Sequence, residues 1–289
     1  MANEQQYGNI FLVEKKSENT VSELKDRFPS KKICVCDFYV SGSEDGEIDE
    51  NGVTNYCDLL IVDHHIPDRY YMSWKISSTV IANRFVSKNG PLTDEYVIVV
   101  NHTDTDSILS SLIMSGKLEP DTEHYDQAAI AADHTGKENV ISDLLQSFED
   151  DRSLKTSIEM LFKILEKRLW VRKEMKRRIA NNEFEMNDGI ALITIDQKID
   201  ACLLVDALPA AEAIVVVSPM PEGSRGKWRI RVRLGIGNLS EAIELNKLNL
   251  PDTGGRWNAV STSRNGGTNI EPEKYLGRVR YEIKQQQNS

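Results

Sequence analysis

The sequence predicts an α/β fold, with an N-terminal doubly wound, mainly parallel sheet, a helical linker and a smaller C-terminal α/β domain. Three observations lead to this prediction. Short apolar runs alternate with helical patterns over residues 1–145, a basic stretch with helical spacing follows over 146–185, and strand patterns return over 186–289. Alternation of strands with helices is typical of a parallel sheet covered on both faces. We expect the domain boundaries at these positions.

The first part contains five apolar runs of strand length, bounded by polar or turn residues. These expected strands are residues 9–13, 33–40, 59–63, 96–101 and 128–132. Between them lie three segments with helical spacing, each with Ser or Thr near its start as a candidate N-cap. These expected helices are residues 17–28, 77–87 and 107–118. Residues 41–55, rich in Gly, Asp and Glu, are expected to form an exposed loop.

Three further strands are expected in the C-terminal part, at residues 190–195, 211–218 and 228–234. In the last of these, Arg229, Arg231 and Arg233 alternate with apolar side chains, so the three arginines share one face of the strand. That face is expected to meet anions or solvent. The glycine-rich segment 254–268 follows, and exposed glycines allow the backbone to approach a ligand closely. The tail after Ile283 is expected to be disordered.

The composition describes a soluble, globular, cytoplasmic protein. Of its 289 residues, 40% are hydrophobic and 28% are charged, and no apolar run is long enough to span a membrane. The start of the chain lacks the pattern of a signal peptide, and the four cysteines are expected to be reduced. A net charge of −10 without a long basic track disfavours binding to duplex nucleic acid. A short substrate suits this charge better, and a homodimer is compatible with the sequence.

Candidate metal ligands follow the expected strands at four places. The chain has five histidines, and four of them stand within two residues of an Asp, shortly after an apolar run. The candidates are Asp37; Asp63, His64 and His65; His102, Asp104 and Asp106; and Asp133 with His134. Because the carboxyl ends of parallel strands meet at one edge of a sheet, we expect these side chains to converge.

The ligand types indicate which ions fit. Carboxylates mixed with imidazole, without thiolate, favour Mn²⁺ or Mg²⁺, while Zn²⁺ and Co²⁺ also suit such a set. The inventory is large enough for two ions about 3.5–4 Å apart. Such a pair activates a water and holds phosphate oxygens for in-line attack. We therefore expect a two-ion, Mn²⁺-dependent hydrolysis of a phosphoester or phosphoanhydride, with Mg²⁺ or Co²⁺ as alternative ions.

These motifs resemble those of the DHH phosphoesterases with a DHHA1-type C-terminal domain. The resemblance is carried by IVDHH (61–65), HTDTDS (102–107), Asp37 and Asp133, and more weakly by the glycines of 254–268. The superfamily includes RecJ-type exonucleases, oligoribonucleases of the nanoRNase type, cyclic dinucleotide phosphodiesterases and manganese inorganic pyrophosphatases. The resemblance implies a metal-binding catalytic domain over 1–145 and a substrate-binding domain over 186–289.

The resemblance also implies roles for individual residues. The implied metal ligands are His102, Asp104, Asp106, Asp37, Asp63, His64 and Asp133. The implied catalytic residues are Asp63, His64, His65 and Asp133, and the family pattern gives His65 a contact with substrate. The implied substrate-binding residues are His65, His134, Arg231, Arg233, Gly254, Gly255, Arg256, Trp257 and Arg264. The family's preference for small polar residues after the DHH segment is matched by Ser77, Ser78 and Thr79.

Two features depart from the family's usual pattern. The DHH segment precedes the HTDTD segment, whereas the usual order is the reverse. A rearranged or circularly permuted sheet that keeps the same edge explains this order, and it requires Asp106 and His64 to lie within roughly 10 Å of each other. The family's GGGH signature here ends in Arg256 and Trp257, without the histidine. Either Arg256 grips a phosphate and Trp257 stacks a base, or Trp257 is a core residue and Arg256 a surface charge.

The leading functional hypothesis is a metal-dependent phosphodiesterase or exonuclease that acts on short single-stranded nucleic acid or small nucleotides. The first alternative is an inorganic pyrophosphatase or polyphosphatase, since the HTDTDS segment resembles the first motif of those enzymes. The second alternative is a non-catalytic replication or repair scaffold with the same fold. The ligand set looks complete, which favours an enzyme over the scaffold.

Overall fold

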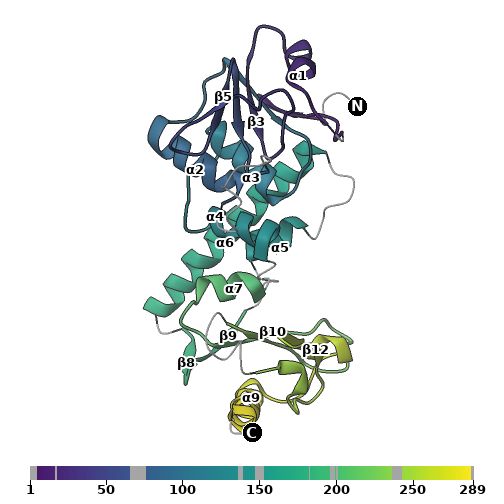
Figure 1. Ribbon diagram of the computed structural model, residues 1–289. Helices are drawn as coiled ribbons and strands as arrows, with labels where there is room; N and C mark the ends of the chain where they lie inside the picture. Colours follow the sequence, from purple (N-terminus) through teal and green to yellow (C-terminus); the bar gives the residue numbers. More distant parts are fainter. Residues whose placement is uncertain are drawn as a thin grey trace. The chain divides into compact units, whose positions relative to one another are not determined.

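The computed structural model describes residues 5–16, 18–65, 76–135, 139–146, 153–181, 183–195, 199, 201–235 and 243–287 (Figure 1). The chain divides into two compact units, residues 1–165 and 166–289, and each unit is described by itself. Most of the stretch predicted as a helical linker is occupied by one long helix, α6 (Leu154–Ala180). In the described part of the chain, no helix is long and apolar enough to cross a membrane.

The first unit is built on a seven-stranded sheet with the order β1-β2-β7-β3-β6-β5-β4. The strands are β1 (Gln6–Tyr7), β2 (Ile10–Leu12), β3 (Lys32–Cys36), β4 (Glu47–Ile48), β5 (Thr54–Tyr56), β6 (Leu59–Val62) and β7 (Tyr96–Val100). The four central strands β2, β7, β3 and β6 are parallel, and antiparallel strands flank them on both sides. The predicted mainly parallel sheet is confirmed.

Helices cover both faces of this sheet. The helices of the first unit are α1 (Val21–Arg27), α2 (Ser78–Asn89), α3 (Thr105–Met114), α4 (Tyr125–Ile130), α5 (Val140–Gln146) and the start of α6. On one face, Cys34 and Ile98 pack in a core with Leu112 of α3. On the other face, Val35 packs in a second core with Leu24 of α1. The unit is therefore a three-layer, doubly wound α/β fold, with α1 apart from α2 and α3 in Figure 1.

Capping side chains start three helices near the predicted positions, although α3 begins at Thr105 and its cap is Asp104, so the expected Ser or Thr cap is wrong there. Thr20 forms a capping box with Glu23 at the start of α1, Ser77 accepts a hydrogen bond from Val80 at the start of α2, and Asp104 caps α3. Each cap satisfies a backbone N–H that has no partner within its helix. Because Ser77 and Asp104 directly adjoin the motifs, these caps also fix the motif residues relative to the helices.

Two predicted elements of the first unit are wrong. Residues 128–132 were expected as a strand but belong to α4 and to the π-helical turn Ala131–Thr135. Periodicity cannot distinguish a short apolar run in a strand from one in a buried helix, and alanine is the strongest helix former. Residues 41–55 were expected as a loop but contain β4 and β5, which extend the sheet beyond β6.

The second unit is built on a six-stranded sheet with the order β12-β13-β11-β10-β9-β8. Its strands are β8 (Glu185–Asn187), β9 (Ile190–Thr194), β10 (Ala213–Pro219), β11 (Trp228–Leu234), β12 (Gly254–Arg256) and β13 (Ala259–Ser261). Only β9 and β10 are parallel among these described strands. The other elements are α7 (Ala201–Ala207), α9 (Pro272–Gln287) and 3-10 turns at Leu245–Lys247 and Thr262–Asn265. The predicted smaller α/β domain is confirmed.

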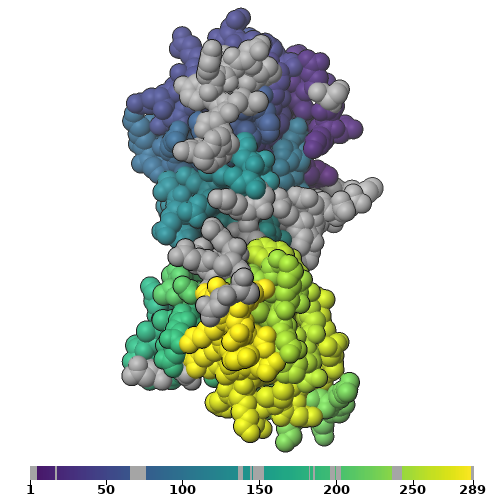
Figure 2. Space-filling model, turned by 60° about the horizontal axis from the view of Figure 1, so that its bottom comes forward, coloured from purple at the N-terminus to yellow at the C-terminus, as the bar shows by residue number. Residues whose placement is uncertain are grey.

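The helix α9 covers one face of this second sheet. Tyr275 and Val279 of α9 are fully buried and pack in one core with Ile230 and Val232 of β11. The surface of α9 forms the yellow part of Figure 2, next to the yellow-green surface of the segments that precede it. The prediction of a disordered tail after Ile283 is wrong, because α9 continues to Gln287. Buried Ile283 provides the physical reason, since it anchors the last turns of the helix to the core.

Candidate metal centre

The predicted motifs converge because three neighbouring parallel strands carry them. Asp37 follows β3, Asp63 follows β6, and His102 lies shortly after β7. Since β7, β3 and β6 are adjacent in that order, their carboxyl ends place these three segments side by side. The strand that carries HTDTD is the last of the three in the sequence but lies next to β3 in space. This arrangement is what the rearranged-sheet hypothesis predicts.

The distance between His64 and Asp106 tests that hypothesis. His64 Nδ1 lies 3.4 Å from Asp106 Oδ2, well within the limit of roughly 10 Å for one binuclear site. Both residues are buried. The hypothesis of a rearranged sheet with the usual edge therefore survives its test.

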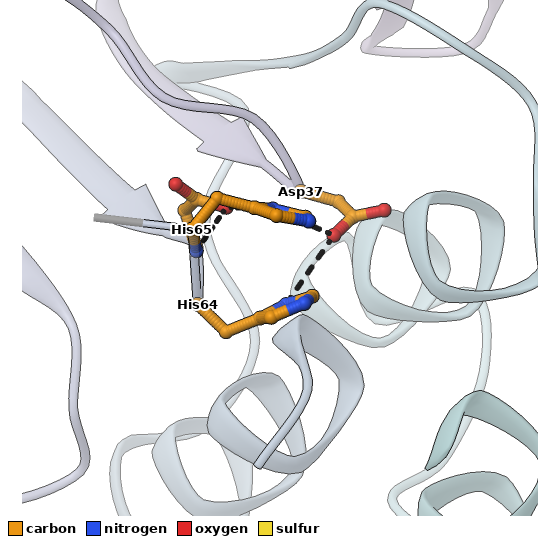
Figure 3. Close-up of side chains that lie close together, drawn as sticks. Asp37, His64 and His65 are labelled. Carbon is orange, nitrogen blue, oxygen red and sulfur yellow. Dashed lines mark hydrogen bonds and ion pairs between the residues drawn. The ribbon is translucent and has the colours of Figure 1, made fainter. Parts of the chain in front are cut away.

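Asp37 is the centre of the cluster. Its Oδ2 lies 3.1 Å from His102 Nε2, and its Oδ1 lies 3.6 Å from His64 Nδ1 and 3.9 Å from His65 Nδ1. Figure 3 shows both imidazoles of the DHH segment directed at this carboxylate. The Asp37 backbone is left-handed, with φ +64°, a strained conformation that clusters at functional sites. Its N–H still donates to the carbonyl of Val62 at 2.9 Å, which holds the turn against β6.

The buried carboxylates strongly perturb one another. Burial, and then the negative charges of Asp106, Asp104, Asp133 and Asp63, raise the pKa of Asp37 well above its ordinary value. Asp106 itself is completely buried. A group of buried acids without lysine or arginine contacts in the described ion pairs demands a compensating cation. This uncompensated negative charge is the first indication that the residues suit a divalent metal ion.

The N-terminus of α2 holds Asp106 in place. The backbone N–H groups of Ser78 and Thr79 each donate to one of its carboxylate oxygens at 2.7 Å. The positive end of a helix dipole favours such an anion. The hydroxyl of Ser78 also donates to Asp37 Oδ1 at 2.9 Å and lies 3.3 Å from His64 Nδ1. Ser78 therefore joins three of the motif residues.

The imidazole of His102 is oriented as a metal ligand requires. Its Nδ1 lies 2.5 Å from Asn101 Oδ1, an acceptor, so Nδ1 can donate to Asn101, which leaves Nε2 for an ion or, without an ion, for a proton. Nε2 faces two carboxylate oxygens, at 2.9 Å from Asp104 and 3.1 Å from Asp37. A neutral imidazole in this tautomer needs a cation or a proton at that position. Binding of the second ring nitrogen to an acceptor is the usual arrangement of metal-binding histidines.

Asp104 remains an acid of low pKa in this setting. Burial would raise its pKa, but the hydrogen bond and charge of His102, together with the N–H of Ser107, lower it to about 2. Asp104 also caps α3 through Ser107 at 2.9 Å. It is thus ionised over the physiological range and available as a carboxylate ligand.

The fourth motif reaches the cluster from a helix instead of a strand. Asp133 and His134 lie on the π-helical turn after α4, and the ring centroids of His134 and His64 are 5.3 Å apart. Asp133 is exposed as a residue, yet its carboxyl group faces the buried acids. Desolvation, and then the charge of and a hydrogen bond with Asp106, raise the pKa of Asp133 to about 9. The position of this motif was predicted correctly although its secondary structure was not.

The remaining DHH residues complete the site. Asp63 accepts hydrogen bonds through Oδ1 from the N–H and the Nδ1 of His65, at 3.2 and 2.8 Å. Its other oxygen, Oδ2, is buried without a hydrogen-bond partner in the described part of the chain, as expected of an atom that binds an ion. Burial lowers the pKa of His64, which favours the neutral imidazole that a metal requires.

The candidate ligands form three groups, and within each group the ligand atoms lie within 4.8 Å of one another. They are Asp37, Asp63, His64 and His65; His64, Asp133 and His134; and Asp37, His102 and Asp104. Two groups share Asp37, as expected of a carboxylate that bridges two ions, and two share His64. The donor set, the orphaned oxygen of Asp63 and the tautomer of His102 all fit a divalent metal centre.

Three of the predicted substrate-binding arginines and one glycine of the second unit share one face of its sheet: Arg231, Arg233, Arg256 and Gly254. Arg233 lies opposite Ala259, which lies opposite Arg256. In the same register, Arg231 and Gly254 both lie opposite Ser261. Residues directly opposite in antiparallel strands have their side chains on the same face. The core with α9 lies on the other face, so the arginine face is the one turned away from that core.

Exposure excludes one part of the second interpretation of the Arg256 and Trp257 pair, namely a core Trp257. Trp257 is 45% exposed, so the prediction that it is a core residue is wrong, and its ring is available to a ligand. Arg256 is exposed as well. Gly255 is required by packing, because a Cβ there would lie 2.1 Å from the carbonyl oxygen of Ala259. A Cβ on Gly254 would come 3.3 Å from the side chain of Arg264, which places that arginine beside the glycine pair.

Sequence reasoning assigned no role in the site to several residues that support it. Asn101, Ser78 and Ile76 all contact the motif residues but carry no motif of their own. The signal for Asn101 was its position directly before His102 at a strand end. Ser78 was noticed only through the family resemblance, and its contacts with Asp37 and Asp106 depend on tertiary structure.

No protein-family model matches the chain, and no curated protein matches it in sequence. Among solved structures, it is similar to a pGpG-specific phosphodiesterase, PggH, of Vibrio cholerae, with 10% identity, a TM-score of 0.36, and coverage of 69% of this chain and 82% of that one. It is also similar to an exopolyphosphatase-related protein of Bacteroides fragilis, with 12% identity, a TM-score of 0.29, and coverage of 93% and 76%.

A third similar structure is RecJ of Thermus thermophilus in complex with Mg²⁺, with 13% identity, a TM-score of 0.28, and coverage of 72% of this chain and 34% of RecJ. At these identities, function has to be inferred from the residues of this chain. In its motifs and in their convergence at one sheet edge, the chain resembles the DHH phosphoesterase superfamily.

Proposed function

We propose that the chain is a divalent-metal-dependent phosphodiesterase that hydrolyses short oligonucleotides or small nucleotides. One observation carries this proposal. A single buried carboxylate, Asp37, lies within 4 Å of the imidazoles of His64, His65 and His102. A buried acid surrounded by histidines from two strand ends suits a bridging ligand between two ions.

The residues divide between two metal positions that share Asp37. His102 and Asp104 would hold the first ion, and Asp106, His64 and Asp133 would hold the second. Asp63 supplies its unpaired Oδ2 from the buried side of the cluster, where the described part of the chain offers that atom no hydrogen bond. When bound, Mn²⁺, Mg²⁺ or Co²⁺ would stabilise negative charge on a phosphate and lower the pKa of a water. Mn²⁺ is the ion that we propose first, because carboxylates outnumber imidazoles in the set.

His65 is the proposed proton donor. Its side chain is 53% exposed, unlike that of His64, so it borders the solvent side of the cluster. Its Nδ1–H donates to Asp63, which leaves Nε2 available to give a proton to the leaving oxygen. The hydrogen bond with Asp63 raises the pKa of His65, so more of this imidazole is protonated at neutral pH. A carboxylate that orients and stabilises an imidazolium is a common device in acid–base catalysis.

The arginine face of the second unit is the proposed substrate-binding surface. Arg233, Arg256 and Arg264 supply positive charge for phosphate groups, and the partly buried Arg231, which also donates to the carbonyl of Ile199 at 2.7 Å, adds to that charge. The exposed ring of Trp257 supplies a surface on which a base can stack. Four arginines and one aromatic ring suit a substrate of a few nucleotides better than a long polymer.

A substrate panel with Mn²⁺ tests the proposal. Labelled di- to pentanucleotides of RNA and DNA, linear and cyclic dinucleotides, and pyrophosphate would be incubated with the full chain and with the Asp104→Ala variant. We expect cleavage of at least one nucleotide substrate, lost in the variant and in the presence of a chelator. Release of phosphate from pyrophosphate alone would instead support the pyrophosphatase alternative. Failure to bind metal or to cleave anything would support the non-catalytic scaffold.

A further inference from the structure

We infer that His134 is an additional nitrogen ligand, so that the two metal positions differ in their chemistry. This inference rests on the proposed metal centre and goes beyond it. The sequence suggested only a contact between His134 and substrate. The structure instead places the His134 ligand atom within 4.8 Å of those of His64 and Asp133.

The backbone at His134 is unusual. Asp133 and His134 lie on a five-residue π-helical turn, Ala131–Thr135, that follows directly on α4. π-Helical turns are rare and occur frequently at functional sites. Successive residues of a regular α-helix point in directions about 100° apart, which makes it difficult for two neighbours to face one ion. The wider turn allows Asp133 and His134 to face the same point.

A second contact fixes the tautomer of His134. Its Nε2 lies 2.9 Å from the carbonyl oxygen of Ile76. A carbonyl only accepts, so Nε2 must carry the proton and Nδ1 carries the lone pair of the neutral ring. Metal-binding histidines characteristically donate their other ring N–H to a backbone carbonyl or a carboxylate. The same arrangement is found at His102, whose partner is Asn101.

The two ends of the cluster now differ in composition. One group, Asp37, His102 and Asp104, offers two carboxylates and one imidazole. The other, His64, Asp133 and His134, offers one carboxylate and two imidazoles, and the proposed ligand Asp106 adds a second carboxylate there, so the second position has one imidazole more than the first. Oxygen ligands suit Mn²⁺ and Mg²⁺, whereas imidazole suits Zn²⁺, Co²⁺ and Ni²⁺. We therefore expect the second position to bind Co²⁺ or Zn²⁺ more tightly than the first, and to favour these ions over Mg²⁺.

Titration of the metal-free full chain with Co²⁺ tests the inference. Calorimetry would count the ions and give their affinities, and X-ray absorption would count the imidazoles around cobalt. The variants are His134→Ala and His134→Gln, with His124→Ala as the matched control. His124 lies at the start of α4, and its ring contacts the carboxylate of Asp121 at 2.7 Å.

We expect the wild-type chain and the His124→Ala variant to bind two ions with unequal affinities. Both His134 variants should lose one affinity by ~10–100-fold, keep the other, and show fewer imidazoles per cobalt. Free imidazole should restore part of the loss in His134→Ala, which a merely structural role would not allow. Circular dichroism identifies an unfolded variant, in which case the more conservative His134→Gln decides.

Two other results would overturn the inference, in distinguishable ways. If both His134 variants bind two cobalt ions with unchanged affinities and imidazole counts, His134 is not a ligand, while the metal centre and the proposed function stand. If the wild-type chain binds no cobalt, manganese or magnesium, the metal centre fails, and the proposed function and this inference fail together.

Discussion

The metal centre of the first unit consists of buried charged groups in mutual contact, whereas the arginine face of the second unit includes exposed ones. In the first, Asp37, Asp63 and Asp106 are at most 2% exposed and are held by imidazoles, the Ser78 hydroxyl and backbone N–H groups. In the second, Trp257 is 45% exposed, and Arg256 and Arg264 lie at the surface. Buried charges in contact cannot be changed one at a time without consequences for the rest. Exposed groups can, so the second unit is the natural place for specificity to vary.

The strongest test of this contrast is Asp37→Asn. This variant removes the charge from the centre of the cluster while keeping the size of the side chain. Phosphodiesterase activity should fall about 1000-fold or more, because several kcal/mol of transition-state stabilisation depend on the ions it holds. The metal-free variant should nevertheless melt at a higher temperature than the wild type at neutral pH, since its folded state no longer has to keep a buried carboxyl group protonated against its ordinary pKa. Activity assays and thermal melts in a chelator measure the two effects.

Activity and stability changing in opposite directions is the signature of a functional site. A control variant, Ser111→Ala, removes a fully buried hydroxyl that donates to Ile108 within α3 and should leave activity within a few-fold of the wild type. If Asp37→Asn lowered both activity and metal-free stability, Asp37 would be a residue that stabilises the fold. The hypothesis that its burial costs stability in the metal-free protein would then be contradicted.

The next largest effect is expected from Ser78→Ala. The Ser78 hydroxyl joins Asp37 and His64, whereas its N–H, which holds Asp106, is unaffected by the substitution. Loss of an outer-shell partner typically costs ~10–100-fold in metal affinity. Mn²⁺ titration followed by electron paramagnetic resonance should show weaker binding, with activity restored at high Mn²⁺. Ser111→Ala is again the matched control. Equal Mn²⁺ affinities for the two variants would show that the Ser78 hydroxyl does not support metal binding.

The sequence predicted the metal centre because local residue patterns locate the strand ends that carry its ligands. Apolar runs ending in Asp and His predict strand ends, and parallel strand ends share an edge, so Asp37, Asp63 and His102 could be placed together. Asp133 was expected after a strand and lies on a helix, because an alanine-rich run fits both structures. The π-turn and the Ser78 contacts could not be predicted. They depend on how α2 and α4 pack against the sheet, which no residue spacing encodes.

The second unit was less predictable for a physical reason. Its Gly254 and Gly255 matched a family signature, but the exposure of Trp257 depends on the β12–β13 hairpin that carries it. Residues at a hairpin end can be core or surface with the same local sequence. The shared face of the β11 arginines could be predicted, because strict alternation along a strand places them on one side.

A third, smaller effect is expected from Trp257→Ala. Removing one stacking surface costs roughly 1–3 kcal/mol per base, so KM for a dinucleotide should rise about 5- to 150-fold, while kcat changes little. Because the side chain is exposed, the free energy of unfolding should change by no more than about 0.5 kcal/mol. Steady-state kinetics at saturating Mn²⁺ and denaturant titrations measure both. Trp170→Ala, another exposed tryptophan of the second unit, is the control. A fall in kcat with unchanged KM would place Trp257 in the chemistry instead of in substrate binding.

The smallest expected effect is a difference in how pH acts on the two units. The pKa of Asp133 is raised to about 9, and that of Asp37 is also raised. Between the ordinary pKa of about 3.9 and these values, the folded state holds protons that the unfolded state has released. Stability therefore falls as pH rises through this window. In a chelator, hydrogen exchange corrected for its intrinsic pH dependence should show α3 less protected at pH 8 than at pH 5. The protection of β11, which carries no such acids, should change little.

Mn²⁺ should abolish that difference, because the ions compensate the ionised carboxylates and bind them most strongly at high pH. The contrast between the units would then disappear in the metal-loaded protein and be restored by the chelator. Protection of α3 that rises with pH in the metal-free state would mean that these acids are stabilised as carboxylates without an ion. The buried charge would then have a compensating partner within the chain, and the case for a metal centre would lose its electrostatic basis.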